Sequence, residues 1–482
     1  MKNPPSIKAK LEAYKFQIEA VDSIRDLPYA AVFHEQGLGK TKIAIDLLLG
    51  WFEKDQIDTA FIVTKKSLIK NWLDELKIHS HLSPAVLTGN RKENSNALNS
   101  PVLVYVLNYE ILPSNLDLLS LFLKTCRVAA ILDESHKIKN PDAKVSKAFH
   151  SVSEDFEKKV IMSGTPVANR PYDLWSQIKF LDEGESLGTS FNDFKEATDI
   201  DSTLSDEDGY AERLAAIYED IQDFTIRETK ISAGIKLPNK SIHNHFVEMQ
   251  SEQLRIYNEY KHLLRHEIWS EGALTIDDAE AILKRLLRLV QCASNPFMVD
   301  ETYSELPAKY TKLLELITEN IPNSSNIIIW SGFIKNIEWL YNQLREFNPA
   351  ISHGALSVDE RNNQIGIFKT QSHCRILLAT PGTAKEGLTL TNANHVVFYD
   401  RSFSLDDYLQ AQDRIHRISQ TEECFVHNLI ANDSIDIWVD SLLEAKSQVA
   451  KLAQGDINTG DFLEKFNFDL KELLSEVLDI EN

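Results

Sequence analysis

The chain has 482 residues, of which 43% are hydrophobic and 26% are charged, and its formal net charge is −21. These proportions are ordinary for a soluble globular protein of two to four domains, and the acidity of the whole chain disfavours nucleic acid as a partner. The N-terminal residues MKNPPSIKAK lack the apolar stretch of a signal peptide, and no apolar run could span a bilayer, so we expect a cytoplasmic protein that contacts no membrane.

The negative charge is concentrated in two segments. Residues 182–223 contain fourteen acidic against two basic side chains, and residues 456–482 contain eight against two. The remainder of the chain is nearly neutral, so a local basic groove for nucleic acid is still possible. We favour solvated helix faces for both acidic segments. Binding of another protein by the acidic C-terminal tail is the alternative.

The first informative stretch is YAAVFHEQGLGKTKIAIDLLLGWF. A short apolar run, a glycine turn and a helical apolar pattern follow one another, which is the order that aims a helix N-terminus at phosphate. Lys40 supplies a charge for the outer phosphates and Thr41 a hydroxyl for magnesium. The usual phosphate-loop pattern has glycine where this chain has His34. This stretch alone therefore leaves a chance turn with a solvated lysine as the alternative.

Strand-like apolar runs alternate with helical stretches along most of the chain. Such runs predict parallel sheets covered on both faces. The series is interrupted between about Leu181 and Pro307, where helical spacing dominates. We therefore expect two α/β lobes with a mostly helical region between them. The strand-like runs are AAVF, TAFIVT, VLVYVLN, RVAAILD and KKVIMSG in the first part, and NIIIWSG, RILLAT, HVVFYD and FVHNLI in the second.

Two adjacent carboxylates end the run RVAAILDE. Asp133 can hold magnesium and Glu134 can orient and deprotonate a water molecule, a pair that suits hydrolysis of ATP. Taken alone, the pair could equally cap the next helix. In the distant stretch QAQDRIHRISQ, Arg414 and Arg417 lie three apart and would share one face of a helix, from which they could reach a γ-phosphate.

Taken in order, these segments resemble the motor core of the SWI/SNF-like family of superfamily 2 helicases. YKFQIEAV resembles the glutamine motif, HEQGLGKT the phosphate loop, and VTKKSLIKNW, LDESHKIKN and MSGTPVANRPYDLW the later motifs of the first lobe. IIIWSGF, RILLATPGTAKEGLTLT and QAQDRIHRISQ follow in the order of the second lobe. The first position of the family's phosphate loop is commonly Asp rather than Gly, so His34 does not argue against the site.

The resemblance implies a fold, cofactors and a partner. The fold is α/β, with two RecA-like parallel-sheet lobes and helical insertions between them. The cofactors are ATP and magnesium, and the partner is double-stranded DNA. The implied domains are a first lobe at 1–236 with an acidic helical protrusion at about 181–230, a helical protrusion and linker at 237–306, a second lobe at 307–445, and an acidic helical tail at 446–482.

The resemblance also implies roles for individual residues. Glu134 would activate water and Arg414 and Arg417 would act as arginine fingers, while Gln17 would read adenine. The nucleotide-binding residues would be Gln17, Gly37, Leu38, Gly39, Lys40, Thr41 and Gly387, and the magnesium ligands Thr41 and Asp133. The DNA contacts would be Lys65, Lys66, Ser331, Gly332 and Thr389.

These expectations lead to a hypothesis about function. We expect an ATP-driven translocase on duplex DNA that remodels or displaces DNA-bound species without a strand-separating wedge. A strand-separating DNA or RNA helicase is the first alternative. A non-catalytic ATP-binding scaffold is the second, which the intact Lys40, Asp133, Glu134 and arginine pair disfavour.

Overall fold

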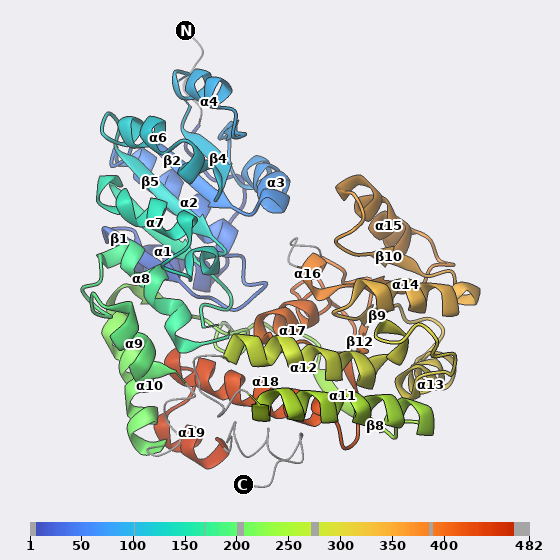
Figure 1. Cartoon of the computed structure of the whole chain (residues 1–482). Helices are drawn as coiled ribbons and strands as arrows, with labels where there is room; N and C mark the ends of the chain where they lie inside the picture. The colour runs from blue at the N-terminus through green and yellow to red at the C-terminus, as the bar shows by residue number, and fades with distance from the viewer. Residues whose placement is uncertain are drawn as a thin grey trace. The chain divides into compact units, whose positions relative to one another are not determined.

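The computed structural model (Figure 1) describes residues 6–100, 102–167, 169–199, 207–270, 279–384 and 389–466. The chain divides into two compact units. The first comprises Met1–Lys236 together with Val449–Glu464, and the second comprises Leu237–Gln448 together with Lys465–Asn482. Each unit is built on a parallel sheet flanked by helices, so the expected fold class is confirmed.

The sheet of the first unit has seven parallel strands in the order β3-β4-β2-β5-β6-β1-β7. Its central strands are buried on both faces, which explains why they read as continuous apolar runs. The strands are β1 (Tyr29–Val32), β2 (Thr59–Thr64), β3 (Ala85–Leu87), β4 (Val104–Asn108), β5 (Val128–Asp133), β6 (Lys158–Met162) and β7 (Thr225–Ile226).

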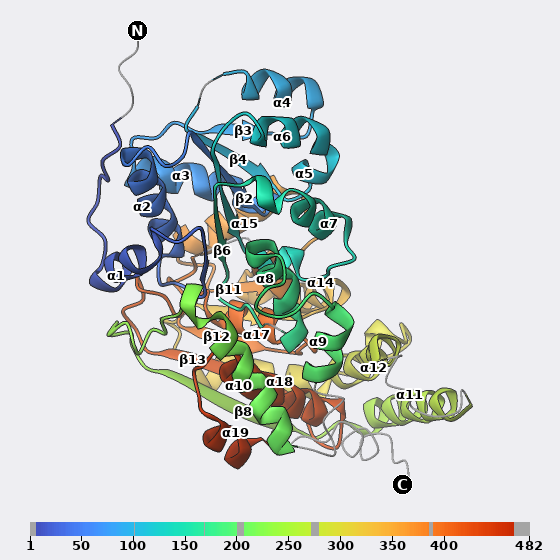
Figure 2. The ribbon, with the colours of Figure 1, turned by 90° about the vertical axis from the view of Figure 1, so that its left-hand side faces the viewer.

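Helices cover both faces of this sheet. Figure 2 shows α1 (Lys15–Ile24), α2 (Lys40–Glu53) and α3 (Ile69–His79) on one side of it, where Trp51 and Trp72 join the core. On the other face, the ring of Phe61 packs against those of Tyr105 and Phe122. The remaining helices are α4 (Arg91–Leu98), α5 (Ile111–Ser114), α6 (Leu116–Leu123), α7 (Lys144–Ser151), α8 (Trp175–Asp182), α9 (Phe191–Thr198), α10 (Glu207–Ile221) and α19 (Thr459–Lys465).

The sheet of the second unit has six parallel strands in the order β10-β11-β9-β12-β13-β8. One of its faces packs Trp330 and Phe398 with Phe368, and the other packs Ile329 and Tyr399 with their neighbours on flanking helices. The strands are β8 (Lys240–Val247), β9 (Ile327–Trp330), β10 (Ala350–Ser352), β11 (Ile376–Ala379), β12 (His395–Phe398) and β13 (Cys424–Ala431).

The two longest helices between β8 and β9 in sequence, α11 and α12, pack against each other. One helix, α18, carries residues of both units, because the division falls between Gln448 and Val449. The helices are α11 (Ser251–Ser270), α12 (Ala279–Ser294), α13 (Ala308–Glu315), α14 (Ile334–Gln343), α15 (Val358–Thr370), α16 (Pro381–Ala384), α17 (Leu405–Gln412) and α18 (Ile435–Ala453).

Strand β8 was not predicted from the sequence, in which helical spacing indicates helices and connections in this region. It pairs with β13 over eight residues. Its inner face is largely polar: His245 Nε2 lies 3.0 Å from Nδ1 of His427, and burial lowers the pKa of His427 to about 3. Its outer face exposes Ile242 and Phe246. An edge strand of this composition lacks the apolar signal on which the expectation depended.

The end of the chain also differs from the expected tail. The predicted boundary at 446 falls inside α18, and Val449–Glu464 belongs to the first unit. Residues 467–482, which hold most of the predicted amphipathic tail, lie outside the described residues. Within the part of the chain that is described, every helix is too short or too polar to cross a membrane.

Candidate active site

The predicted phosphate loop connects β1 to α2. Gly37 and Gly39 have φ angles of 87° and 71°, a region that favours glycine, and Gly39 is the N-cap of α2. Lys40 and Thr41 are the first two residues of the helix, and both are partly exposed. Free backbone amides at a helix N-terminus attract anions. The strand, turn and helix expected from the sequence are therefore present in a form that suits phosphate.

His34, the residue that departs from the usual loop pattern, points its side chain into the protein. The imidazole is buried, its ring centroid lies 6.3 Å from that of Phe16, and burial lowers its pKa to about 4. The backbone carbonyl of His34 accepts a hydrogen bond of 2.9 Å from Lys40 Nζ. The loop thus uses the backbone at this position, which explains why a residue other than glycine is accommodated.

Gln17 braces the loop from α1. Its Nε2 donates to the carbonyl of Leu38 at 3.1 Å, and its Oε1 accepts from the backbone N–H of Tyr14 at 3.0 Å. A Cβ atom on Gly39 would lie 2.4 Å from Gln17 Nε2, so a side chain at position 39 would displace the glutamine. The structure brings Gln17 and the loop together, and its contact with adenine stays a prediction.

The predicted carboxylate pair lies at the end of β5. Asp133 is the last residue of the strand, and Glu134 follows with a left-handed backbone (φ 55°, ψ 51°), a conformation that costs on the order of 1 kcal/mol and is frequent at functional sites. Glu134 Oε2 lies 3.4 Å from His136 Nδ1. Burial raises the pKa of Asp133, and so does the charge of Glu134, while the Lys40 ammonium lowers it. The phosphate loop and the carboxylate pair therefore share one electrostatic environment.

The donor atoms present fit a magnesium ion. Asp133 Oδ2 accepts hydrogen bonds from Trp72 Nε1 at 2.8 Å and from Thr64 Oγ1 at 3.1 Å. Among the described residues, no side chain donates a hydrogen bond to Oδ1. A carboxylate oxygen oriented by its neighbours, together with the hydroxyl of Thr41, is the type of oxygen ligand that magnesium prefers.

The residues that orient this pair were not predicted from the sequence. Besides Thr64 and Trp72, the hydroxyl of Tyr109 donates to the Asp133 carbonyl at 2.7 Å. Gln177 joins two motifs, because its Oε1 accepts from Ser135 Oγ at 2.7 Å and its Nε2 donates to the Pro166 carbonyl at 3.1 Å. Trp72 lies in the stretch VTKKSLIKNW, which resembles a family motif, but the sequence does not show where its indole points.

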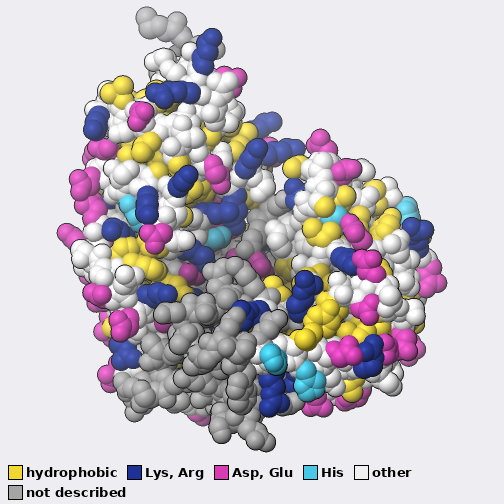
Figure 3. All heavy atoms as spheres, viewed as in Figure 1, with side chains coloured by type: hydrophobic (Ala, Val, Ile, Leu, Met, Phe, Trp, Pro, Cys, Tyr) yellow, Lys and Arg dark blue, Asp and Glu magenta, His cyan; other side chains and the backbone are white. Residues whose placement is uncertain are grey.

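The predicted DNA contacts of the first unit follow directly on Thr64. Lys65 is partly exposed and Lys66 is exposed, at the carboxyl end of β2. On the visible face of the first unit, Lys and Arg side chains are spread among Asp and Glu rather than gathered in one patch (Figure 3). Their contact with DNA stays a prediction.

The predicted DNA contacts after β9 are held by one buried carboxylate. Asp400 accepts from the Ser331 hydroxyl at 2.5 Å and from the Gly332 backbone N–H at 2.6 Å. Burial raises the pKa of Asp400, and these two hydrogen bonds and the charge of Lys309 act in the opposite direction. The side chain of Ser331 is fully buried, so the exposed parts of this turn are the ones that could meet a ligand.

Arg414 and Arg417 lie in the turn that follows α17 rather than on a continued helix, because α17 ends at Gln412. Arg414 is only 2% exposed, and its Nε donates to the Gln410 carbonyl at 3.1 Å. Arg417 is more accessible, and its Nη1 donates to the hydroxyl of Thr389 at 2.8 Å. The structure thus places a predicted arginine finger beside a predicted DNA contact. Gly387 lies outside the described residues.

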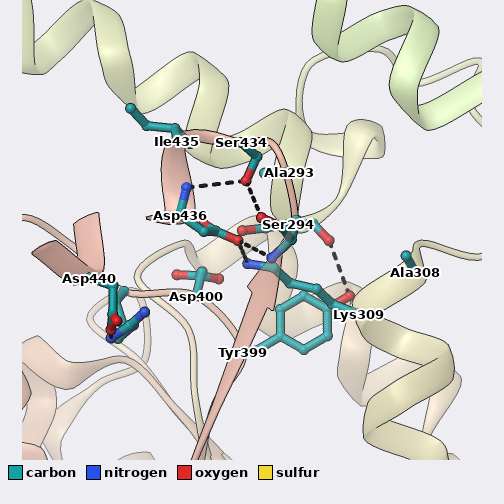
Figure 4. A network of polar contacts seen from close by, with 12 residues as sticks. Ala293, Ser294, Ala308, Lys309, Tyr399, Asp400, Ser434, Ile435, Asp436 and Asp440 are labelled. Carbon is teal, nitrogen blue, oxygen red and sulfur yellow. Dashed lines mark hydrogen bonds and ion pairs between the residues drawn. The ribbon is translucent and has the colours of Figure 1, made fainter. Parts of the chain in front are cut away.

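A buried ion pair supports this part of the second unit (Figure 4). Lys309 Nζ on α13 lies 2.6 Å from Asp436 Oδ2 at the start of α18, and their side chains are 0% and 6% exposed. Close by, the hydroxyl of Tyr399 donates to the Ser294 carbonyl at 3.2 Å. The ion pair joins the start of α13 to the start of α18, and the Tyr399 bond joins the end of β12 to the end of α12.

We expect Lys309→Met to destabilise the second unit by about 3–5 kcal/mol, because it leaves the Asp436 carboxylate buried without its counter-charge. The readout is the urea unfolding transition followed by circular dichroism. Lys312→Met is the matched control on the same helix: its pair with Glu315 is partly exposed, and its loss should cost less than about 1 kcal/mol. Equal losses in the two variants would show that the buried pair has no special role.

Comparison with known proteins agrees with this architecture. Residues 30–298 match the family model of the SNF2-related domain, and residues 308–419 match that of the helicase conserved C-terminal domain. The putative ATP-dependent helicase/translocase YwqA of Bacillus subtilis is 28% identical over 460 residues, which cover 92% of this chain and 48% of the relative. The ISWI chromatin-remodeling complex ATPase ISW1 of Saccharomyces cerevisiae is 25% identical over 481 residues, covering 94% and 41%.

Among solved structures, the SWI2/SNF2 ATPase core of Sulfolobus solfataricus in complex with dsDNA covers the whole chain with 24% identity and a TM-score of 0.44. The chain spans less than half the length of the curated relatives it matches. The SNF2-related domain alone accounts for more than half of the chain, and it contains the phosphate loop and the Asp133–Glu134 pair described above. This chain therefore belongs to the SNF2-related family.

Proposed function

We propose that the chain is an ATP-driven translocase on double-stranded DNA that displaces DNA-bound species. The observation that carries the proposal is that the phosphate loop after β1 and the carboxylate pair at the end of β5 lie at the carboxyl edge of one parallel sheet. Magnesium is part of the proposal, since the oxygen donors fit it. The names of the relatives, an ATP-dependent helicase/translocase and a chromatin-remodeling ATPase, support the same activity.

The predicted site residues of the first unit then have distinct parts in the reaction. Lys40 and the amides at the start of α2 bind the phosphates. Thr41 and Asp133 would hold magnesium, which would supply positive charge beside the phosphate oxygens. Glu134 orients the attacking water and accepts its proton. Trp72, Thr64 and Tyr109 keep Asp133 in place through the hydrogen bonds described above.

The second unit contributes charge and a link to DNA. Arg417 supplies a guanidinium that stabilises the transition state when the units close on the nucleotide. Thr389 shares a hydrogen bond with Arg417, so a DNA contact at Thr389 acts on the arginine directly. Repeated closure and opening on one strand moves the protein along the backbone.

Translocation without strand separation is favoured by the insertions. Separating base pairs needs a wedge that offsets roughly 1.4 kcal/mol per base-pair step, and holding the released strand needs a basic groove with stacking aromatics. The region from 182 to 223 is instead strongly acidic, and α9 and α10 account for much of it. It would repel a displaced strand rather than hold it.

We therefore expect duplex DNA to stimulate ATP hydrolysis more than single-stranded DNA or RNA, and a third strand to be displaced from a triplex while a plain forked duplex stays paired. The measurement compares ATPase rates with the three nucleic acids and follows both displacement reactions by gel. Lys40→Ala is the control that removes the contribution of ATP binding. Fork separation as efficient as triplex displacement would favour the helicase instead.

A further inference from the structure

The segment Val449–Glu464, called here the return segment, brings the end of the chain back to the first unit. It begins within α18, whose earlier residues belong to the second unit, and it ends with α19. Its contacts with the first unit are therefore made by residues more than two hundred positions away from their partners in sequence.

The return segment is packed closely against α10. The ring of Phe462 is fully buried, and its centroid lies 6.4 Å from that of Tyr210. Gly455 has a φ of 73°, and a Cβ atom at this position would lie 2.9 Å from the ring of Tyr218. Such close approach requires glycine, so the segment has a fitted seat on the first unit.

One guanidinium joins the return segment to the phosphate loop. Arg227 donates from Nε to Asp456 Oδ1 at 2.6 Å and from Nη2 to Asp456 Oδ2 at 2.5 Å. Its Nη1 donates to the carbonyl of Phe33 at 2.6 Å. The side chains of Arg227 and Asp456 are 13% and 19% exposed, so solvent screens the contact only in part.

The carbonyl that Arg227 contacts belongs to the start of the loop. Phe33 precedes His34, whose own carbonyl accepts from Lys40. The backbone of the loop also bonds to the residues on either side of Arg227. The Phe33 N–H donates to the Ile226 carbonyl at 2.9 Å, and the Glu35 N–H donates to the Glu228 carbonyl at 2.8 Å. The Arg227 contact is thus one of several side-chain and backbone bonds that set the path of residues 33–35.

We infer that Arg227 is a positioning residue for nucleotide binding and that Asp456 acts through it. A planar guanidinium whose Nε and Nη2 both donate to one carboxylate has its third nitrogen fixed in direction, and here that nitrogen, Nη1, donates to the Phe33 carbonyl. Without Asp456 the guanidinium is free to turn, and the loop loses part of its preorganisation. This inference rests on the proposed function.

The test is a double-mutant cycle on ATP affinity, measured by titration with a fluorescent ATP analogue in the full chain. Asp456→Ala and Arg227→Ala should each raise the Kd by about 3- to 30-fold. The double variant should bind no more weakly than Arg227→Ala alone, because Asp456 acts through the arginine. Arg227→Lys, which keeps the charge and one donor, should recover part of the affinity.

A matched control comes from the same unit. Arg127 is also bonded to a carboxylate and to a backbone carbonyl, those of Asp58 and Asp55, at the opposite end of β5. Arg127→Ala and Asp58→Ala should leave the Kd unchanged, whatever they do to the unfolding transition. This comparison separates loop positioning from a general loss of stability.

The outcomes are distinct. Wild-type affinity in Asp456→Ala, or additive losses in the double variant, would overturn the inference. If Asp456→Ala does not fold, Asp456→Asn takes its place, since it keeps the size and one acceptor while removing the charge. A wild-type chain that binds no ATP would instead refute the proposed function, independently of any variant.

Discussion

Glu134→Gln is expected to lower the rate of ATP hydrolysis by about 10²- to 10⁴-fold while ATP binding is retained. The amide keeps the size of the side chain but cannot accept the proton of the attacking water. Lys40 and the loop amides, which hold the phosphates, are unaffected by the change. The measurement pairs steady-state ATPase rates with the Kd of a fluorescent ATP analogue.

Glu110→Gln is a suitable control for this prediction. Glu110 is an exposed carboxylate that follows strand β4 of the same sheet, where it accepts from Asn108 Nδ2 at 2.5 Å. Its loss should leave the rate unchanged. Hydrolysis at the wild-type rate in Glu134→Gln would mean that another group activates water.

Arg417→Ala is expected to lower the DNA-stimulated ATPase rate by about 10³-fold or more, as removal of an arginine finger does. The effect on hydrolysis without DNA should be smaller, because the guanidinium contributes only when DNA holds the units closed on the nucleotide. ATP affinity should change little, since the phosphates are held by the first unit. The ratio of stimulated to basal rate is therefore the informative quantity.

Arg345→Ala provides the comparison for Arg417→Ala. Arg345 is an exposed arginine of the second unit that donates to Asn342 Oδ1 at 2.8 Å, away from the turn after α17. Unchanged stimulation in this variant would exclude a general effect of lost positive charge. If Arg417→Ala kept full stimulation while binding ATP, the finger would have to be assigned elsewhere.

The parts of the site that could be predicted from the sequence are short motifs of consecutive residues. The phosphate loop and the Asp133–Glu134 pair each follow a buried strand, and apolar runs bounded by glycine or charge reveal such strands reliably. His34 illustrates the limit of a pattern, because its backbone carbonyl receives the contact and its side chain faces the core.

The parts that sequence could not predict depend on distant pairings. Trp72 and Asp133 are separated by 61 positions, and Arg227 and Asp456 by 229. No periodicity within a window of fifteen residues carries information about such contacts. Strand β8 was missed for a related reason: its inward face is largely polar, and His245 pairs with His427 of β13 across the sheet, so neither propensity nor alternation marked the strand.

The pairing of β8 with β13 also has a consequence for biosynthesis. Asn244 and its partner Asn428 are 184 positions apart, so β8 leaves the ribosome long before β13 exists. At about 5–20 residues per second, the delay is roughly 10–40 s. During that time β8, with Ile242 and Phe246 on one face, has no neighbour in its own sheet. The nascent second unit is therefore exposed to mispairing until β13 has been synthesised, and a chaperone that shields strand edges should raise the yield of folded protein.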